Sequence, residues 1–213
     1  RRKGEFLFND GGVTFERWFS CASCHQEDAT VDGLNWDLLN DGIGNPKNNK
    51  SMHDAVDTPP AMWSGVRENM EEAVAAGQRF AGFFPDSEKN RALLEYISTP
   101  ERVRSPYRDI DPGAVRRGAK LFLRARCDSC HPAPTFTDRR MHDLGLVSPN
   151  DAVSRFDTPS LRECWRTAPY LHDGRAATLG ELFSLHDPRG VHGRTKGFSR
   201  AQLRDLLEFV RSL

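Results

Sequence analysis

A five-residue motif that occurs twice constrains this 213-residue chain more than any other feature. Cys-Ala-Ser-Cys-His occupies residues 21–25, and Cys-Asp-Ser-Cys-His occupies residues 127–131. A thioredoxin-like redox pair should follow a strand in a βαβ pattern, and neither motif does so. A four-cysteine zinc site brings its pairs within about 15–20 residues of each other. Here over a hundred residues separate the pairs, and zinc gives no reason for the histidines, so the motifs indicate covalent attachment of haem c.

In c-type attachment, two thiols on one helical turn add to the vinyl groups of haem, and the adjacent histidine ligates the iron from one face. The predicted attachment residues are Cys21, Cys24 and His25 for the first haem, and Cys127, Cys130 and His131 for the second. The fifth cysteine, Cys164, stands alone. We expect it to be a small buried hydrophobe rather than a reactive thiol.

Charge and hydropathy narrow the class of protein further. The 30 basic and 30 acidic residues balance, so no overall basic field argues for binding nucleic acid. No apolar run approaches the roughly 18 residues that span a bilayer, so we expect no membrane span in this chain. Bacterial haem c attachment happens outside the cytoplasm, which predicts a periplasmic or otherwise extracytoplasmic protein. Because the chain begins with Arg1 and shows no signal sequence, we expect a processed form or a piece of something longer.

The regions around the two motifs repeat each other. The matching segments are RKGEFLF and RRGAKLF (2–8 and 116–122), DTP and DTP (57–59 and 157–159), and LLEYI and LLEFV (93–97 and 206–210). Each copy is predicted to run as a short helix, the haem motif, a loop-rich stretch, Thr-Pro and a closing helix.

The closing helices carry the clearest helix signals. Ser199 begins a capping box, and apolar residues follow at helical spacing through Val210. Asp86 or Ser87 is the predicted N-cap in the first copy, and residues 99–112 read as a linker. We therefore expect an all-α, loop-rich fold of two tandem cytochrome c-like domains, each wrapped round one covalent haem c, with residues 1–104 for the first haem and residues 105–213 for the second. Buried haem would supply the apolar core that about 100 residues strain to build.

Several longer segments resemble the bacterial di-haem cytochrome c peroxidases and the related MauG-type proteins. These segments are GNPKN (44–48), MWSG (62–65), DTPSLR (157–162) and TAPYLHDGR (167–175). The resemblance covers nearly the whole chain, and the Thr-Ala-Pro-Tyr-x-His-x-Gly run is its most specific part. The chain is shorter than those enzymes, mainly between the domains.

The resemblance implies roles around the second haem, which is the electron-entry haem of the family. The sixth iron ligand of that haem lies on the helix after the Thr-Ala-Pro-Tyr run, which makes His186 the expected ligand and His192 the fallback. Two imidazoles would lower the reduction potential relative to His/Met ligation. Residues expected to pair with propionates or to donate hydrogen bonds near this haem are Arg162, His172 and His142.

Two further features follow from the resemblance. Trp63 matches the tryptophan that relays electrons between the haems, although plain core packing would also explain it. One Ca²⁺ between the domains would be held at Asn48, Thr167 and Pro169, and oxygen ligands of this kind suit calcium. An ordinary turn next to Pro46 is the alternative explanation for Asn48.

The first haem departs from the family. The segment Leu38–Gly42 contains no histidine where the peroxidases place a distal one, and Ala73 and Phe83 stand at the places of their Gln and Glu. An alignment of the two halves puts Gly77 opposite His186. Three outcomes stay open for the sixth position of the first iron: His53, a methionine, or an open face. The methionine candidates are Met52, Met62 and Met70.

The sequence thus predicts a di-haem c-type cytochrome that acts mainly in electron transfer. One alternative is a peroxidase that reduces H2O2 to water at the first haem with electrons entering at the second. Candidates for its acid/base chemistry are His53, Glu71 and Glu72. Another alternative is the electron-accepting module of a longer enzyme or complex. The expected partner is accordingly a small redox protein, a cytochrome c or a cupredoxin, or a larger redox complex.

Overall fold

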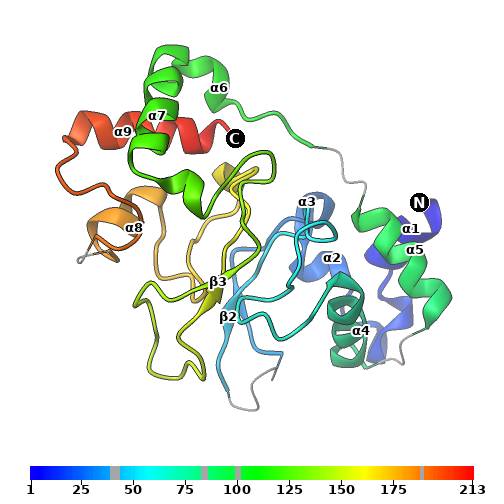
Figure 1. Ribbon diagram of the computed structural model, residues 1–213. Coiled ribbons are helices and arrows are strands. Elements are labelled where there is room, and N and C mark those ends of the chain that lie inside the picture. The colour runs from blue at the N-terminus through cyan, green and yellow to red at the C-terminus, as the bar shows by residue number, and fades with distance from the viewer. Residues whose placement is uncertain (39–43, 83–85, 99–101, 188–189) are drawn as a thin grey trace. The chain divides into compact units, whose positions relative to one another are not determined.

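The computed structural model describes residues 1–38, 44–82, 86–98, 102–187 and 190–213. The chain forms two compact units, Arg1–Glu101 and Arg102–Leu213, so the boundary falls slightly before the predicted division at residues 104 and 105. Helices and loops dominate both units, and the expected all-α, loop-rich fold is confirmed (Figure 1). No helix in these described ranges is long and apolar enough to cross a membrane.

The first unit is built from five α-helices and one short antiparallel ladder within its described residues. The helices are α1 (Arg2–Asn9), α2 (Cys21–Cys24), α3 (Gln26–Ala29), α4 (Met70–Phe80) and α5 (Ser87–Ile97), with 3-10 turns at Gly11–Val13 and Phe15–Arg17. Strands β1 (Asn35–Trp36) and β2 (Lys47–Asn48) pair with Asn35 opposite Asn48. The apolar core gathers side chains of α1, α4 and α5 around the first Cys-x-x-Cys turn.

The second unit repeats this plan. Its helices are α6 (Tyr107–Ile110), α7 (Pro112–Arg124), α8 (Leu179–Ser184) and α9 (Arg200–Arg211), with 3-10 turns at Cys127–Ser129 and Cys164–Arg166. Strands β3 (Met141–His142) and β4 (Phe156–Asp157) pair with Met141 opposite Asp157. The predicted linker is wrong in its second half, because α6 forms inside it, while residues 99–101 lie outside the described part.

The helix ends follow from local chemistry. Ser199 and Gln202 form the predicted capping box at the start of α9. The Asp86 carboxylate accepts the backbone N–H of Lys89 and caps α5, as predicted. Asp111 caps α7 in the same way, with Pro112 at the first helical position, where a missing N–H costs nothing.

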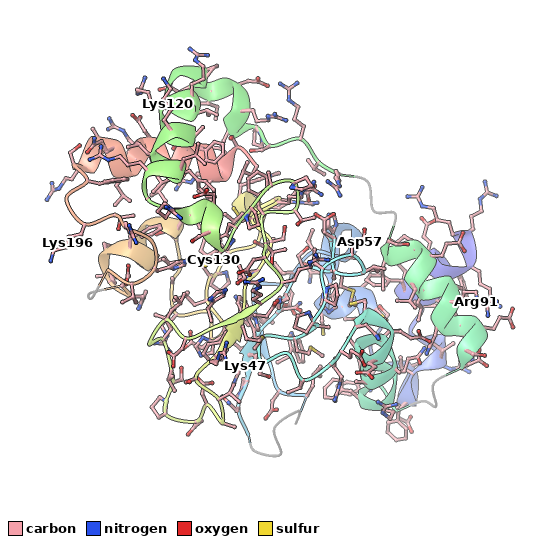
Figure 2. The ribbon with its side chains drawn as sticks, viewed as in Figure 1. Lys47, Asp57, Arg91, Lys120, Cys130 and Lys196 are labelled. Atoms are coloured by element: carbon pink, nitrogen blue, oxygen red, sulfur yellow. The ribbon has the colours of Figure 1, made fainter. Side chains whose placement is uncertain are left out.

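In each unit, the helix that precedes the haem motif crosses the last helix at a glycine. A Cβ atom on Gly4 of α1 would lie 1.9 Å from the Ala92 carbonyl oxygen of α5. A Cβ atom on Gly118 of α7 would lie 2.0 Å from the Asp205 carbonyl oxygen of α9. Glycine therefore permits a backbone approach that any side chain would prevent. Charged side chains such as Arg91 on α5 and Lys120 on α7 lie on the exposed faces of these helices (Figure 2).

Aromatic pairs next to the two crossings match as well. The ring centres of Phe8 and Tyr96 lie 5.1 Å apart, and those of Phe122 and Phe209 lie 5.2 Å apart. The same glycine and the same aromatic pair thus recur at equivalent positions. These contacts confirm that the sequence repeat is a repeat of structure.

The loops before α4 and α8 are equivalent too, but the helices that follow differ in length. Isolated bridges join Ala61 to Arg67 in one unit and Tyr170 to Ala176 in the other. Helix α4 then runs for 11 residues, whereas α8 runs for six and ends at Ser184. After Ser184, the chain of the second unit therefore no longer follows the path that α4 takes in the first unit.

Candidate haem centres

The first motif forms one helical turn that presents both of its cysteines. Ser20 and Ser23 cap this turn, and the backbone N–H of His25 donates to the Cys21 carbonyl at 2.9 Å. His25 Nδ1 lies 3.2 Å from the Thr30 carbonyl oxygen, which can act as an acceptor but not as a donor, so Nδ1 carries the proton. Nε2 is then the nitrogen left for a metal. Burial lowers the pKa of His25, which favours the neutral form that ligates metals.

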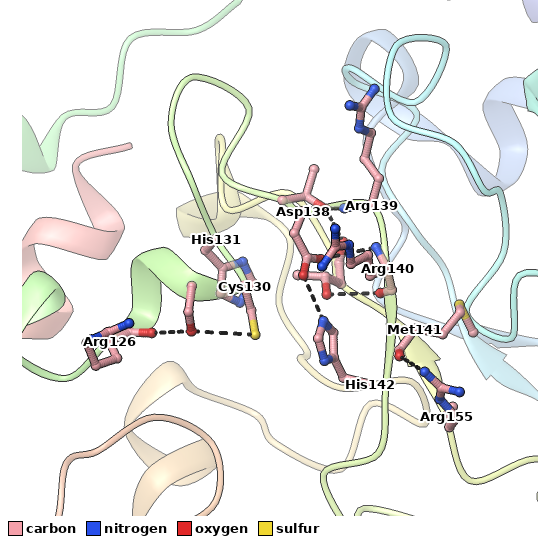
Figure 3. Close-up of polar contacts among 12 residues, drawn as sticks. Arg126, Cys130, His131, Asp138, Arg139, Arg140, Met141, His142 and Arg155 are labelled. Carbon is pink, nitrogen blue, oxygen red and sulfur yellow. Dashed lines mark hydrogen bonds and ion pairs between the residues drawn. The ribbon is translucent and has the colours of Figure 1, made fainter.

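The second motif has the same local geometry. The backbone N–H of His131 donates to the Cys127 carbonyl at 2.8 Å, and His131 Nδ1 lies 2.9 Å from the carbonyl oxygen of Phe136, five residues on. Burial lowers the pKa of His131 as well. Ser129 donates to the Arg126 carbonyl and lies beside the Cys130 sulfur (Figure 3). Both histidines are therefore presented in the same tautomer by the same turn.

Burial holds three of the four motif cysteines in the thiol form. All four cysteines are free of disulfides. Burial raises the pKa of Cys21, Cys24 and Cys127 to about 11, so these groups are thiols rather than thiolates near neutral pH. A reactive dithiol would need the thiolate. Cysteines on one turn with the following histidine fit covalent addition to haem vinyl groups.

The ring that the structure brings next to His131 belongs to His192. The two ring centres lie 6.4 Å apart, with 34° between the ring planes. Burial, followed by the proximity of His131, lowers the pKa of His192 to about 4, so its imidazole is neutral. His192 Nδ1 is buried without a hydrogen-bond partner in the described ranges. His186 lies beyond the end of α8 and is half-buried.

These observations test whether the second site fits haem. Two neutral imidazoles with ring centres 6.4 Å apart, one of them with a buried nitrogen that has no partner among the described residues, suit the binding of haem iron. The attachment cysteines lie on the same turn as His131. Haem bound there would supply one-electron redox chemistry. Cys127, Cys130 and His131 would hold it there.

Polar groups expected near the second haem occupy defined places. His142 Nε2 lies 2.8 Å from the Asp138 carboxylate, and the Asp138 backbone N–H donates to the Cys130 carbonyl at 2.8 Å (Figure 3). Ligand atoms of Cys130, Asp138 and His142 all lie within 4.8 Å of one another. A thioether at Cys130 would leave its sulfur a poorer metal ligand than a thiolate. The role of His142 near the haem stays a prediction.

His172 is held inside the second unit. Its Nε2 lies 2.7 Å from the Asp151 carboxylate, and its ring stacks on Phe156 at 3.9 Å. Its contact with haem stays a prediction, as does the propionate pairing of the half-buried Arg162.

The residues predicted as possible ligands or acid/base groups of the first haem lie in different environments. His53 is buried, and Met70 lies in the core of the first unit, with Met52 and Met62 packed against it. Glu71 and Glu72 are exposed, and the Glu72 carboxylate accepts the backbone N–H of Glu68 at the start of α4. Ala73 is buried in the core. Leu39–Gly42 and Phe83 lie outside the described residues.

Trp63 and the calcium candidates have definite partners. The Trp63 indole N–H donates to the Asn48 carbonyl oxygen at 2.7 Å, and Lys50 Nζ lies 5.1 Å from the centre of the Trp63 ring. The Thr167 hydroxyl donates to the Cys164 carbonyl. Asn48 lies in the first unit, whereas Thr167 and Pro169 lie in the second. Electron relay through Trp63 and the calcium site both stay predictions.

Sequence reasoning did not single out Gln78. This side chain on α4 is only 2% exposed, and neither its amide nitrogen nor its amide oxygen has a hydrogen-bond partner in the described part of the chain. It follows Met70 and Val74 at helical spacing, on the stripe of α4 that packs into the core. In the sequence, Gln78 could have been recognised as a polar residue on the otherwise apolar face of α4.

Two c-type haem motifs in two helical, loop-rich units define a di-haem c-type cytochrome. The chain is 31% identical to hydrazine synthase subunit gamma of Kuenenia stuttgartiensis, with all of this chain and 77% of that protein covered. It is 23% identical to the methylamine utilization protein MauG of Methylophilus methylotrophus, with 99% of this chain and 81% of that protein covered. The chain belongs to the family of di-haem cytochrome c peroxidases and MauG-type proteins.

Solved structures show the same fold. A Kuenenia stuttgartiensis hydrazine synthase structure superposes with a TM-score of 0.88 at 28% identity, covering 100% of this chain and 86% of that one. A MauG-like protein associated with microbial copper homeostasis gives a TM-score of 0.77 at 21% identity, covering 100% and 87%. No model of a known protein family matches the chain.

Proposed function

We propose that this protein carries electrons through two covalently bound haems. The observation that carries this proposal is the repeated presentation of His25 and His131. Each follows a Cys-x-x-Cys turn and donates from Nδ1 to a carbonyl five residues on. A hydrogen bond of this kind fixes the ring and raises the basicity of the ligating nitrogen. Electrons would enter from an external donor at the second haem and pass by way of Trp63 to the first.

The proposal includes the surroundings of the protein. Haem c attachment argues for a periplasmic or otherwise extracytoplasmic location. The donor would be a small redox protein, a cytochrome c or a cupredoxin. The balanced formal charge of the chain argues for a small, transient contact without strong long-range steering. Calcium at Asn48, Thr167 and Pro169 would be a structural ion in this scheme.

Peroxide reduction is less well supported than electron transfer. Glu71 and Glu72 are exposed, and Glu72 is engaged at the start of α4. Neither residue is buried in the manner that tunes a carboxyl group for acid/base chemistry. His53 keeps its place as the candidate acid/base group if the first haem is open, because it is buried.

A role as a subunit of a larger redox complex is a second candidate function. The relative that is 31% identical is itself a subunit, and this chain covers 77% of it. We propose that the cytochrome passes its electrons inside a larger redox assembly of that kind. A stoichiometric complex recovered with the native protein from its own cells would support this candidate. A native mass of a single chain would contradict it.

The central proposal is tested on the mature protein. Mass spectrometry should show two covalent haems. The variant Cys21→Ser/Cys24→Ser should lose one haem, and Cys127→Ser/Cys130→Ser should lose the other. A reduced small cytochrome should then reduce both haems in stopped-flow mixing, without steady-state consumption of H2O2. Fewer than two haems would refute the di-haem reading, and sustained peroxide turnover with this donor would favour the peroxidase.

A further inference from the structure

We propose that His192, and not His186, is the sixth ligand of the second haem iron, and that Asp187 positions His192. The inference rests on the proposed function, since it requires haem at the second motif. It identifies a metal ligand from the structure where sequence register favoured His186. It also defines this centre as a bis-imidazole haem that is closed to outside ligands.

The distance between the two rings suits an iron between them. Imidazole nitrogens bind metals of this size at about 2.0–2.1 Å, so two nitrogens on opposite sides lie about 4 Å apart. The ring centres then lie about 6 Å apart, since each centre is set back from its nitrogen. The observed separation of His131 and His192 is 6.4 Å. Ordinary stacking would bring the rings closer, as in the 3.9 Å contact of His172 with Phe156.

Both rings are already fixed on the protein side. His131 uses Nδ1 to donate to Phe136, which leaves Nε2 for the iron. His192 packs against Phe183, with ring centres 5.8 Å apart. A buried imidazole nitrogen without a partner is costly, and among the described residues Nδ1 of His192 has none. Metal ligation would give the His192 ring a polar role.

Asp187 holds the backbone that carries His192. Its carboxylate accepts the backbone N–H of Val191 at 2.8 Å and that of His192 at 3.2 Å. Asp187 is itself buried. Two hydrogen bonds to one buried carboxylate fix the start of the ligand loop, which we define as residues 190–197. Asp187 touches the backbone of His192 and not the iron, so it is a positioning residue.

The ligand loop is also tied to the haem attachment turn. The backbone N–H of Arg194 donates to the Ala125 carbonyl at 2.8 Å, two residues before the motif begins. Gly193 adopts φ +84°, and a Cβ atom there would lie 3.6 Å from the Cys127 sulfur. Glycine supplies this left-handed conformation without strain. Hydrogen bonds on both sides of His192 in the chain thus hold this residue beside Cys127.

The two units differ at this point, which explains the assignment. Helix α4 continues through the position equivalent to His186, where the first unit has Gly77. Helix α8 ends at Ser184, and the backbone N–H of His186 returns to the Glu181 carbonyl. The early end of α8 releases the chain to form the ligand loop. Two imidazoles then stabilise ferric iron relative to His/Met ligation and lower the potential.

The test uses the mature di-haem protein and the matched variants His192→Gly and His186→Gly. The numbers of ferric low-spin and high-spin haems per chain are measured by EPR, together with the covalent haem count. His192→Gly should turn one low-spin haem per chain high spin, and added imidazole should restore it by filling the vacated position. His186→Gly should keep the wild-type spin count.

The opposite pattern would overturn the inference. A His192→Gly protein that keeps the low-spin count, or a His186→Gly protein that loses one and regains it with imidazole, assigns the ligand elsewhere. His192→Met gives an independent readout, since it should stay low spin and raise the midpoint potential of one haem. An unchanged potential would count against ligation by His192. A wild-type protein with two covalent haems and a negative His192 result rejects this inference alone.

Positioning by Asp187 has its own readout. Asp187→Ala should raise the high-spin fraction of one haem, and imidazole should reverse the change. Asp187→Asn keeps one acceptor oxygen and should retain more low-spin haem than Asp187→Ala. Equal, wild-type spin counts in both variants would remove Asp187 from this role.

Discussion

His172 Nε2 lies 2.7 Å from the Asp151 carboxylate, and both side chains are almost completely buried, at 2% and 1% exposure. The ring of Phe156 covers the imidazole face at 3.9 Å. Burial lowers the pKa of His172 in spite of its acidic neighbour. This pair is therefore a point where proton binding and folding are coupled.

The coupling predicts how stability depends on pH. The unfolded histidine, with a pKa near 6.5, binds a proton more readily than the folded one. Stability contributed by neutral His172 is fully present above about pH 6.5 and is lost as the pH falls from there toward the folded pKa. The free energy of unfolding should fall by up to about 1.4 kcal/mol per pH unit in that window. Denaturant titrations at several pH values measure it.

The variant His172→Gln isolates this contribution. It removes the titrating group, so the slope between about pH 6.5 and 5 should become shallower than in the wild type. Overall stability should fall, because Asp151 loses the partner that is seen at 2.7 Å. A steeper slope in the variant would show that the folded protein holds His172 protonated.

The helix crossing in the first unit predicts a sharp difference between two glycines. Gly4→Ala places a methyl group where the Ala92 carbonyl oxygen would be 1.9 Å away, so α1 and α5 must separate. The expected loss is about 1–3 kcal/mol or more. Gly77→Ala on α4 is the matched control, because no atom of the described residues lies within 4 Å of the added carbon. Helix propensity should make that variant more stable by up to about 1 kcal/mol.

Thermal or denaturant unfolding of both variants measures their stabilities and tests this prediction. The prediction requires Gly4→Ala to be the less stable of the two. Equal stability of the two variants would mean that the crossing tolerates a wider separation than the structure shows.

The repeated features of this fold could be read from the sequence because they are local. The Cys-x-x-Cys-His turns, the capping box at Ser199 and the repeated Gly4 and Gly118 segments depend on residues close together in the chain. The position of His192 could not be read in this way. It depends on α8 ending at Ser184 and on a loop tied by Arg194 to Ala125. The expectation of His186 followed from the family resemblance, which places the ligand on the helix after the Thr-Ala-Pro-Tyr run.

The His172–Asp151 pair was beyond sequence reasoning for a related reason. Its two members come from different loops, and no periodic pattern links them. Gln78 was overlooked because a single polar residue barely alters the apolar stripe of α4. Contacts that depend on tertiary packing override local pattern in each of these cases.

Because the Gln78 amide is buried, we predict that replacing it with an apolar side chain makes the protein more stable. Its amide is buried with neither atom paired in the described ranges, and an unsatisfied buried polar group costs about 1–3 kcal/mol. Gln78→Leu keeps a similar volume and should raise the free energy of unfolding by about 1 kcal/mol. Gln202→Leu is the contrasting variant, since it removes half of a capping box and should lower stability. A destabilised Gln78→Leu protein would contradict this prediction.

Cys164 predicts a thiol count that reports on both haem sites at once. Cys164 is 5% exposed and packs in the core of the second unit. The expected burial is confirmed, and its thiol donates to the Val210 carbonyl at 3.5 Å. Burial raises its pKa to about 12, which disfavours the reactive thiolate. The native di-haem protein should therefore show no thiol that reacts with Ellman's reagent at pH 8.

Denaturation should then release a single reactive thiol per chain. Four of the five cysteines would be locked in thioethers, and denaturant does not break these bonds. Cys164→Ala is the matched control and should give no reactive thiol in either state. Three reactive thiols in the denatured wild type would mean that one motif carries no haem. A reactive thiol in the native state would mean that the core around Cys164 opens.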